Sequence, residues 1–227
     1  MKSLLTVVLV IFTRSIGFTQ DCSAVTGASD GITGLGGYGD PHVDQLIIQE
    51  LHFLAQCLGV HPAFYFFDDA GGHNAYSTEV SLRDQSADGT VVFGRGLHQD
   101  QMLSSLGGTN VPIILAHEFG HTVARKFHLE LPTKENELFA DYIAGGYMFY
   151  RNRDFKSVDM QSAFRAFFNM GDNDFTSSSH HGTPESRTRC LRQGYLDAAA
   201  AGNQGHDLTL QDGVNLGSAF VQNNDLP

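Results

Sequence analysis

Two histidines flank a glutamate in the stretch His117-Glu118-Phe119-Gly120-His121. In a helix, residues four apart lie one turn apart on the same face, so both imidazoles can bind one zinc ion. Glu118 lies off that face, where its carboxylate can take a proton from a zinc-bound water that attacks a carbonyl. The H-E-x-x-H pattern therefore predicts a zinc hydrolase, with His117 and His121 as metal ligands and Glu118 as the general base.

A catalytic zinc usually has three protein ligands and keeps a fourth position for water or substrate. His128 follows on the same helix, but it lies roughly 16 Å along the axis from His117, which is too far to share the ion. A second helix, predicted from residue 133 to about 151, is the better source. Glu137 and Asp141 are four apart on one face of it. We therefore expect Glu137 to be the third ligand and Asp141 to hydrogen-bond a ligating histidine.

An ordinary amphipathic helix with two solvated carboxylates would show the same E-x-x-x-D spacing. The E-x-x-x-D pattern lies shortly after the H-E-x-x-H stretch, and this position favours the interpretation of Glu137 as a ligand. Three small residues also allow this helix to approach the first one closely: Ala140, Ala144 and Gly145.

H-E-x-x-H followed by N-E-x-x-A-D at residues 136–141 resembles the gluzincin type of zinc metallopeptidase. A third segment, residues 181–187 (His-Gly-Thr-Pro-Glu-Ser-Arg), resembles the H-(G/P)-x-x-x-x-R segment of two groups. These are the bacterial neutral zinc metallopeptidases and the CAAX-prenyl-protease and heat-shock-peptidase group, of which this chain would match the soluble catalytic core. Unlike that second group, the chain has no membrane-length apolar run after residue 20. The resemblance covers roughly residues 90–197.

The resemblance implies hydrolysis of a peptide or protein substrate with one Zn²⁺ ion as cofactor. The oxyanion that forms during hydrolysis needs a further hydrogen-bond donor. His181 is the favoured candidate because it lies in the resembling segment, with His180 and Tyr142 as the others. A solvent-exposed loop histidine is the alternative for His181.

Two other functions stay open from the sequence. The first is a catalytically inactive secreted zinc-binding protein of peptidase fold. The second is another zinc hydrolase such as a deformylase. That chemistry usually takes a cysteine ligand, and neither Cys57 nor Cys190 lies in a suitable motif.

The elements that would position these residues indicate an α+β fold, a mostly helical zincin-like domain with a small antiparallel sheet before the H-E-x-x-H helix. Strands are predicted at 62–68, 74–80 and 90–94, and helices at 40–58, 111–127, 133–151, 159–170 and 184–201, with one more indicated between 208 and 221. In the gluzincin type an edge strand holds the peptide substrate, which makes 90–94 the candidate. An internal strand without substrate contact is the alternative.

Composition and charge narrow the class of partner. At 227 residues with 41% hydrophobic residues, the chain fits one globular domain, expected at residues 40–227. A net charge of −11 argues against nucleic acid or an anionic membrane surface as partner.

The N-terminal region has the pattern of a targeting signal. Residues 1–20 have the form of a secretory signal peptide, which predicts a secreted or periplasmic protein. An uncleaved N-terminal membrane anchor is the alternative. Residues 21–39 are rich in Ser, Gly and Thr and are expected to form a flexible segment. Export permits disulfides, and a Cys57–Cys190 bond would tie the first helix to a late one.

Overall fold

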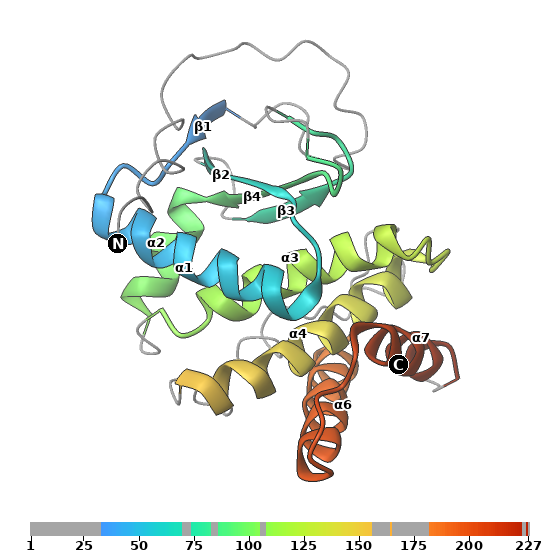
Figure 1. Cartoon of the computed structure of the whole chain (residues 1–227). Helices are drawn as coiled ribbons and strands as arrows, with labels where there is room; N and C mark the ends of the chain where they lie inside the picture. The colour runs from blue at the N-terminus through green and yellow to red at the C-terminus, as the bar shows by residue number, and fades with distance from the viewer. Residues whose placement is uncertain are drawn as a thin grey trace.

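A computed structural model describes residues 33–69, 74–82, 86–104, 108–155, 164, 182–223 and 226. This part of the chain has an α+β fold, in which a four-stranded sheet precedes the long helices (Figure 1). The strands are β1 (Thr33–Gly36), β2 (Ala63–Asp68), β3 (Ala75–Thr78) and β4 (Thr90–Gly94). The helices are α1 (Pro41–Leu58), α2 (Arg95–Leu103), α3 (Val111–Lys126), α4 (Thr133–Phe155), α6 (Pro184–Asn203) and α7 (Leu210–Asn223). The predicted fold class is confirmed.

The sheet is mixed, with the strand order β1-β2-β4-β3. β1 pairs antiparallel with β2, and β3 pairs antiparallel with β4, but β2 and β4 are parallel. The prediction of an antiparallel sheet was therefore wrong. β3 follows β2 in the chain but pairs with the edge of β4 that faces away from β2. Because β3 runs antiparallel to both strands, β4 runs in the same direction as β2. This topology makes β4 an internal strand, and the edge strand that contacts α3 is β3 rather than residues 90–94.

Part of the segment expected to be flexible is strand β1, which is fixed by contacts from distant residues. Arg95 donates from Nη1 to the carbonyl of Gly34 at 2.9 Å and from Nη2 to that of Gly37 at 2.6 Å. Helix α2 was not predicted either. Its first amides, at Gly96 and Leu97, donate to the carboxylate of Asp69 at 2.7 and 3.0 Å.

The main core lies between the inner face of the sheet and the helices. Along β2, Phe64 and Phe66 face this core, whereas Tyr65 and Phe67 belong to a small cluster on the other face of the sheet. Helix α3 is buried along most of its length, because the sheet, α1 and α4 all pack against it (Figure 1). The helix that carries the H-E-x-x-H stretch is thus the central element of the fold.

Small residues set the distances between the helices. A Cβ atom on Gly120 of α3 would lie 2.7 Å from the Cα atom of Ala140 on α4. A Cβ atom on Gly145 of α4 would lie 1.9 Å from the carbonyl oxygen of Leu191 on α6. The prediction that small residues of the second helix permit close packing on the first is confirmed for Ala140, whereas Gly145 permits close packing on α6.

Several other predictions can be compared with the structure. Helix α1 begins as predicted, with the Asp40 side chain accepting from the amides of His42 and Val43. The helix predicted at 159–170 lies outside the described residues except for Phe164, which packs against the main core.

Cys57 and Cys190 are free thiols, so the disulfide considered between them is not formed.

The N-terminal predictions lie largely outside the described residues, since residues 1–32 are not among them. The signal peptide and the site of its cleavage therefore stay predictions. Within the described ranges, no helix combines the length and the hydropathy that crossing a membrane requires.

Candidate metal centre

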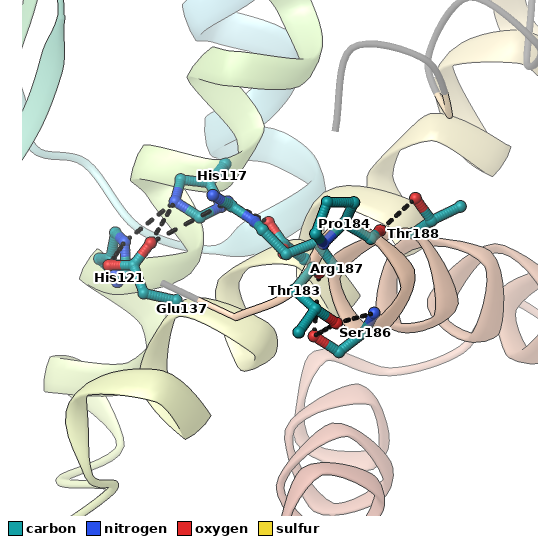
Figure 2. A network of polar contacts seen from close by, with 9 residues as sticks. His117, His121, Glu137, Thr183, Pro184, Ser186, Arg187 and Thr188 are labelled. Atoms are coloured by element: carbon teal, nitrogen blue, oxygen red, sulfur yellow. Dashed lines mark hydrogen bonds and ion pairs between the residues drawn. The ribbon is translucent and has the colours of Figure 1, made fainter. Parts of the chain in front are cut away.

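Three side chains from two helices converge at one point, His117 and His121 from α3 and Glu137 from α4 (Figure 2). The Nε2 atoms of the two histidines lie 3.1 Å apart. Glu137 Oε2 lies 3.3 Å from His117 Nε2, and Glu137 Oε1 lies 3.4 Å from His121 Nε2. The three side chains are 4%, 12% and 14% exposed, respectively. The predicted ligand set is thus brought together in a nearly buried triad.

The spacing of the triad fits a tetrahedral metal ion. Ligand atoms about 2.0–2.1 Å from a zinc ion lie about 3.3 Å from one another when the geometry is tetrahedral. The 3.1 Å between the two Nε2 atoms is close to this value, and each histidine has one oxygen of Glu137 at a similar distance, Oε2 at 3.3 Å from His117 and Oε1 at 3.4 Å from His121. Two imidazole nitrogens and one carboxylate oxygen are ligands that divalent transition metals accept. The residues therefore fit one such ion.

The end of α3 brings Glu137 against the histidines. The helix ends with His128 in the left-handed conformation, at φ 52°, and the amide of Leu129 donates to the carbonyl of Ala124 at 3.0 Å. This helix-ending turn reverses the chain within a few residues, so α4 packs back along α3. The contact of Gly120 with Ala140 then holds the two helices close enough for Glu137 to meet both imidazoles. His128 is exposed at this turn, in agreement with the prediction.

Asp141 orients one of the two histidines. Its Oδ1 atom lies 2.8 Å from Nδ1 of His117, so a proton on Nδ1 is donated to the carboxylate and Nε2 is left to face the triad. Arg187 of α6 holds the same carboxylate with two bonds, Nε to Oδ2 and Nη2 to Oδ1, each 2.8 Å long. Asp141 is 0% and Arg187 2% exposed, so these charges are buried and paired.

Residues 182–187 explain how Arg187 reaches this position. Thr183 caps α6 by accepting a hydrogen bond from the amide of Ser186 at 3.1 Å, and Pro184 is the first helical residue. Gly182 precedes the cap with φ +93°, a conformation that favours glycine. Arg187 therefore lies in the first turn of α6 and points to the triad side (Figure 2).

Arg187 is the functional residue that the sequence reasoning did not assign. The H-(G/P)-x-x-x-x-R pattern contained it, but the pattern alone did not indicate that its arginine pairs with Asp141.

The electrostatics make the two histidines unequal. Burial lowers the pKa of His117, but hydrogen bonds to Asp141 and Glu137 outweigh burial and raise it to about 10. Burial lowers the pKa of His121 to about 4, so this imidazole is neutral at neutral pH. Without a metal, the proton on His117 and the charge of Arg187 balance the two carboxylates. A divalent ion would displace that proton.

Glu118 lies beside the triad on α3 and is 7% exposed. Burial raises the pKa of its carboxyl group to about 7. Within the described ranges, its carboxylate has no hydrogen-bond or ion-pair partner. A carboxylate with a pKa near neutrality and no protein partner can both take and return a proton at neutral pH.

Of the three candidates for the oxyanion donor, only Tyr142 lies among the described residues. His180 and His181 lie outside the described residues, so their roles stay predictions. The hydroxyl of Tyr142 donates to Asp197 on α6 at 2.6 Å, a partner outside the triad. Tyr142 is therefore committed to helix packing rather than to the metal centre.

The α+β fold and the buried His117–His121–Glu137 triad together resemble a zincin site of the HExxH…E type. In comparisons with known proteins, no family model, no curated protein and no solved structure matches the chain significantly. The assignment of a function therefore depends on the geometry of the site.

Proposed function

We propose that this protein is a secreted zinc metallopeptidase that acts as an endopeptidase. The observation that carries the proposal is the set of three ligand side chains, with closest contacts of 3.1–3.4 Å between them, beside a buried carboxylate whose pKa is about 7. Three protein ligands with an open fourth position are the arrangement of catalytic rather than structural zinc sites.

A bound zinc ion would supply a Lewis acid that polarises the scissile carbonyl and lowers the pKa of water. Glu118 accepts the proton of the attacking water and then returns it to the leaving amine. His117 and His121 would hold the ion through their Nε2 atoms once His117 has lost its proton, and Asp141 with Arg187 fixes the ring of His117. The chain's own residues thus provide the base, the ligands and their orientation.

Strand β3 is the proposed platform for the peptide. It is one of the two edge strands of the described sheet, and it lies against α3, where Ser77 Oγ and Thr122 Oγ1 are 3.0 Å apart. An extended peptide can add to a free strand edge through backbone hydrogen bonds. This replaces β4, the strand expected from the sequence, as the candidate for substrate binding.

The first test is a pair of measurements on wild-type protein and Glu118→Gln. Both should bind one zinc ion per chain, since Glu118 is not a ligand. Cleavage of a peptide library, followed by mass spectrometry, should fall by about 100- to 10,000-fold in the variant. Glu135→Gln, the same change in the first turn of α4, is the control and should keep activity. Full activity of Glu118→Gln would refute the role of the base, and bound zinc without any wild-type cleavage would favour a non-catalytic zinc-binding protein.

A further inference from the structure

Arg125 connects the metal-binding helix to the edge strand. It follows His121 by one turn of α3, and its Nη2 atom donates to Ser77 Oγ of β3 at 2.5 Å and to Thr122 Oγ1 at 3.2 Å. Ser77 and Thr122 also contact each other. The guanidinium group is therefore held in place beside the proposed peptide platform, on the turn of α3 that follows His121.

The charge of Arg125 has no close carboxylate partner. Both of its hydrogen-bond acceptors are neutral hydroxyls, and no carboxylate of the described ranges lies within 4 Å of it. Its Nε and Nη1 atoms make no hydrogen bond to the described part of the chain, and neither is a fully buried atom. By contrast, Arg151 and Arg187 each pair with a carboxylate. A partly buried arginine usually has such a partner.

The nearest protein carboxylates offset this charge only from a distance. Burial lowers the pKa of Arg125, and the charges of Glu118 and Glu79 act in the opposite direction. Glu79 is exposed to solvent, and Glu118 has a separate proposed role as the base. The guanidinium is thus fixed by one nitrogen and free to bind an anion with the others.

The position of Arg125 on α3 determines which part of a bound peptide it would contact. Its Cα atom lies about 6 Å along the helix axis from that of His121. Helical side chains lean toward the N-terminus, which agrees with the contact to Thr122 and brings the guanidinium back toward the triad. An extended peptide rises about 3.3 Å per residue. A peptide along β3 would therefore place a group one or two residues from the scissile bond beside Arg125.

We propose that Arg125 binds a carboxylate of the peptide substrate, within about two residues of the scissile bond. The inference depends on the proposed peptidase function for the position of the peptide. The carboxylate can be an acidic side chain or the free C-terminus of a short peptide, because a guanidinium binds both in the same bidentate geometry. The net charge of −11 repels anionic peptides from the protein as a whole. A preference for a carboxylate therefore has to come from a local positive charge, that of Arg125.

The test measures peptide binding to the zinc-loaded Glu118→Gln protein, which leaves the peptides intact, and peptide cleavage by the protein with Glu118. Labelled hexapeptides differ only by Asp or Asn at one position, scanned along the chain, and each is made as a C-terminal acid and as an amide. We expect the carboxylate form to bind about 10- to 100-fold more tightly at one position or at the C-terminus. Arg125→Gln should remove this ratio, whereas Arg125→Lys should keep part of it.

Lys126→Gln is the matched control. It removes the same charge one residue later, but Lys126 contacts the carbonyl of Gly59 and the carboxylate of Asp88. This variant should keep the full acid-to-amide ratio. Zinc content and thermal unfolding establish that Arg125→Gln is folded. If it is not, Ser77→Ala provides the test, because it removes the anchor of the guanidinium and should lower the ratio several-fold.

The outcomes separate this inference from the proposed function. Cleavage by the protein with Glu118, with equal binding of the Asp and Asn peptides and of acids and amides, overturns the role of Arg125 and leaves the peptidase intact. A carboxylate preference that disappears in Arg125→Gln, without cleavage of any peptide, supports Arg125 and overturns the peptidase. A zinc-loaded protein that binds no peptide overturns both.

Discussion

At the scale of single residues, the imidazole of His117 is bound from both sides. Asp141 holds Nδ1 at 2.8 Å, while Nε2 faces His121 and Glu137. Asp141 is in turn held by two bonds from Arg187. Because all three members of this chain of contacts are buried, a residue that does not touch the metal can still determine how well the metal is held.

Replacing Arg187 with lysine tests this chain of contacts. Lysine keeps the charge but cannot make two bonds to Asp141, so the carboxylate and the ring of His117 lose their fixed orientation. We expect zinc affinity to fall about 10-fold or more, measured by competition with a chromogenic chelator. Arg189→Lys, two residues later on an exposed part of α6, should leave the affinity unchanged. Equal affinities for the two variants, both folded, would contradict the role of Arg187.

Zinc binding should depend on pH with a definite sign. The pKa of His117 is raised to about 10, so below pH 10 a proton must leave this residue before its imidazole binds the ion. Affinity should therefore weaken about tenfold for each pH unit between pH 9 and pH 7, as the proton competes more strongly. Titration calorimetry in buffers of different ionisation enthalpy should detect about one proton released per zinc. A pH-independent affinity would show that His117 is not a ligand.

At the scale of elements, local sequence signals determine the helices that carry the ligands. The Asp40 cap marks the start of α1, and the histidine spacing places both imidazoles on one face of α3. The triad and the contact of Asp141 with His117 could therefore be predicted. The role of Arg187 could not, because it depends on where the first turn of α6 meets α4.

The elements that were missed depend on residues distant in sequence. Helix α2 is capped by Asp69 rather than by a neighbour, and β1 is held by Arg95. The parallel pairing of β2 with β4 likewise depends on β3 crossing to the outside of the sheet. No short-range pattern reports such contacts, so the residues 33–36 look like part of a flexible segment.

Two adjacent glycines of α4 allow a test of helix packing. A Cβ atom on Gly145 would lie 1.9 Å from the Leu191 carbonyl oxygen, whereas one on Gly146 would meet only the Gly194 carbonyl oxygen, at 3.7 Å. Gly145→Ala should destabilise the protein by about 1–3 kcal/mol, because α4 and α6 must separate. Gly146→Ala should be neutral or stabilising by up to about 1 kcal/mol, since alanine favours the helix. Urea unfolding measures both, and equal stabilities would contradict the close contact.

At the scale of the whole molecule, the candidate metal centre joins two helices of the central core. The ligands come from α3 and α4, and Arg187 connects the same site to α6 (Figure 2). An ion that binds only the folded state stabilises it by mass action. Zinc should therefore stabilise the packing of these three helices in addition to its proposed role in catalysis.

Removal of zinc should lower the melting temperature. At a free zinc concentration about 1,000 times the dissociation constant, the ion contributes about 4 kcal/mol, which corresponds to a shift on the order of 10 °C for a domain of this size. Calorimetry before and after treatment with EDTA measures the shift. Glu137→Gln should show a much smaller one, because a ligand is missing. A wild-type melting temperature that does not respond to EDTA would contradict this coupling.

The most direct test of the account is a crystal structure of the zinc-loaded protein with anomalous diffraction at the zinc absorption edge. We predict a single anomalous peak about 2.0–2.2 Å from Nε2 of His117, from Nε2 of His121 and from the carboxylate of Glu137. A zinc ion bound elsewhere, or one held by the two histidines with Glu137 turned away, would contradict the central claim.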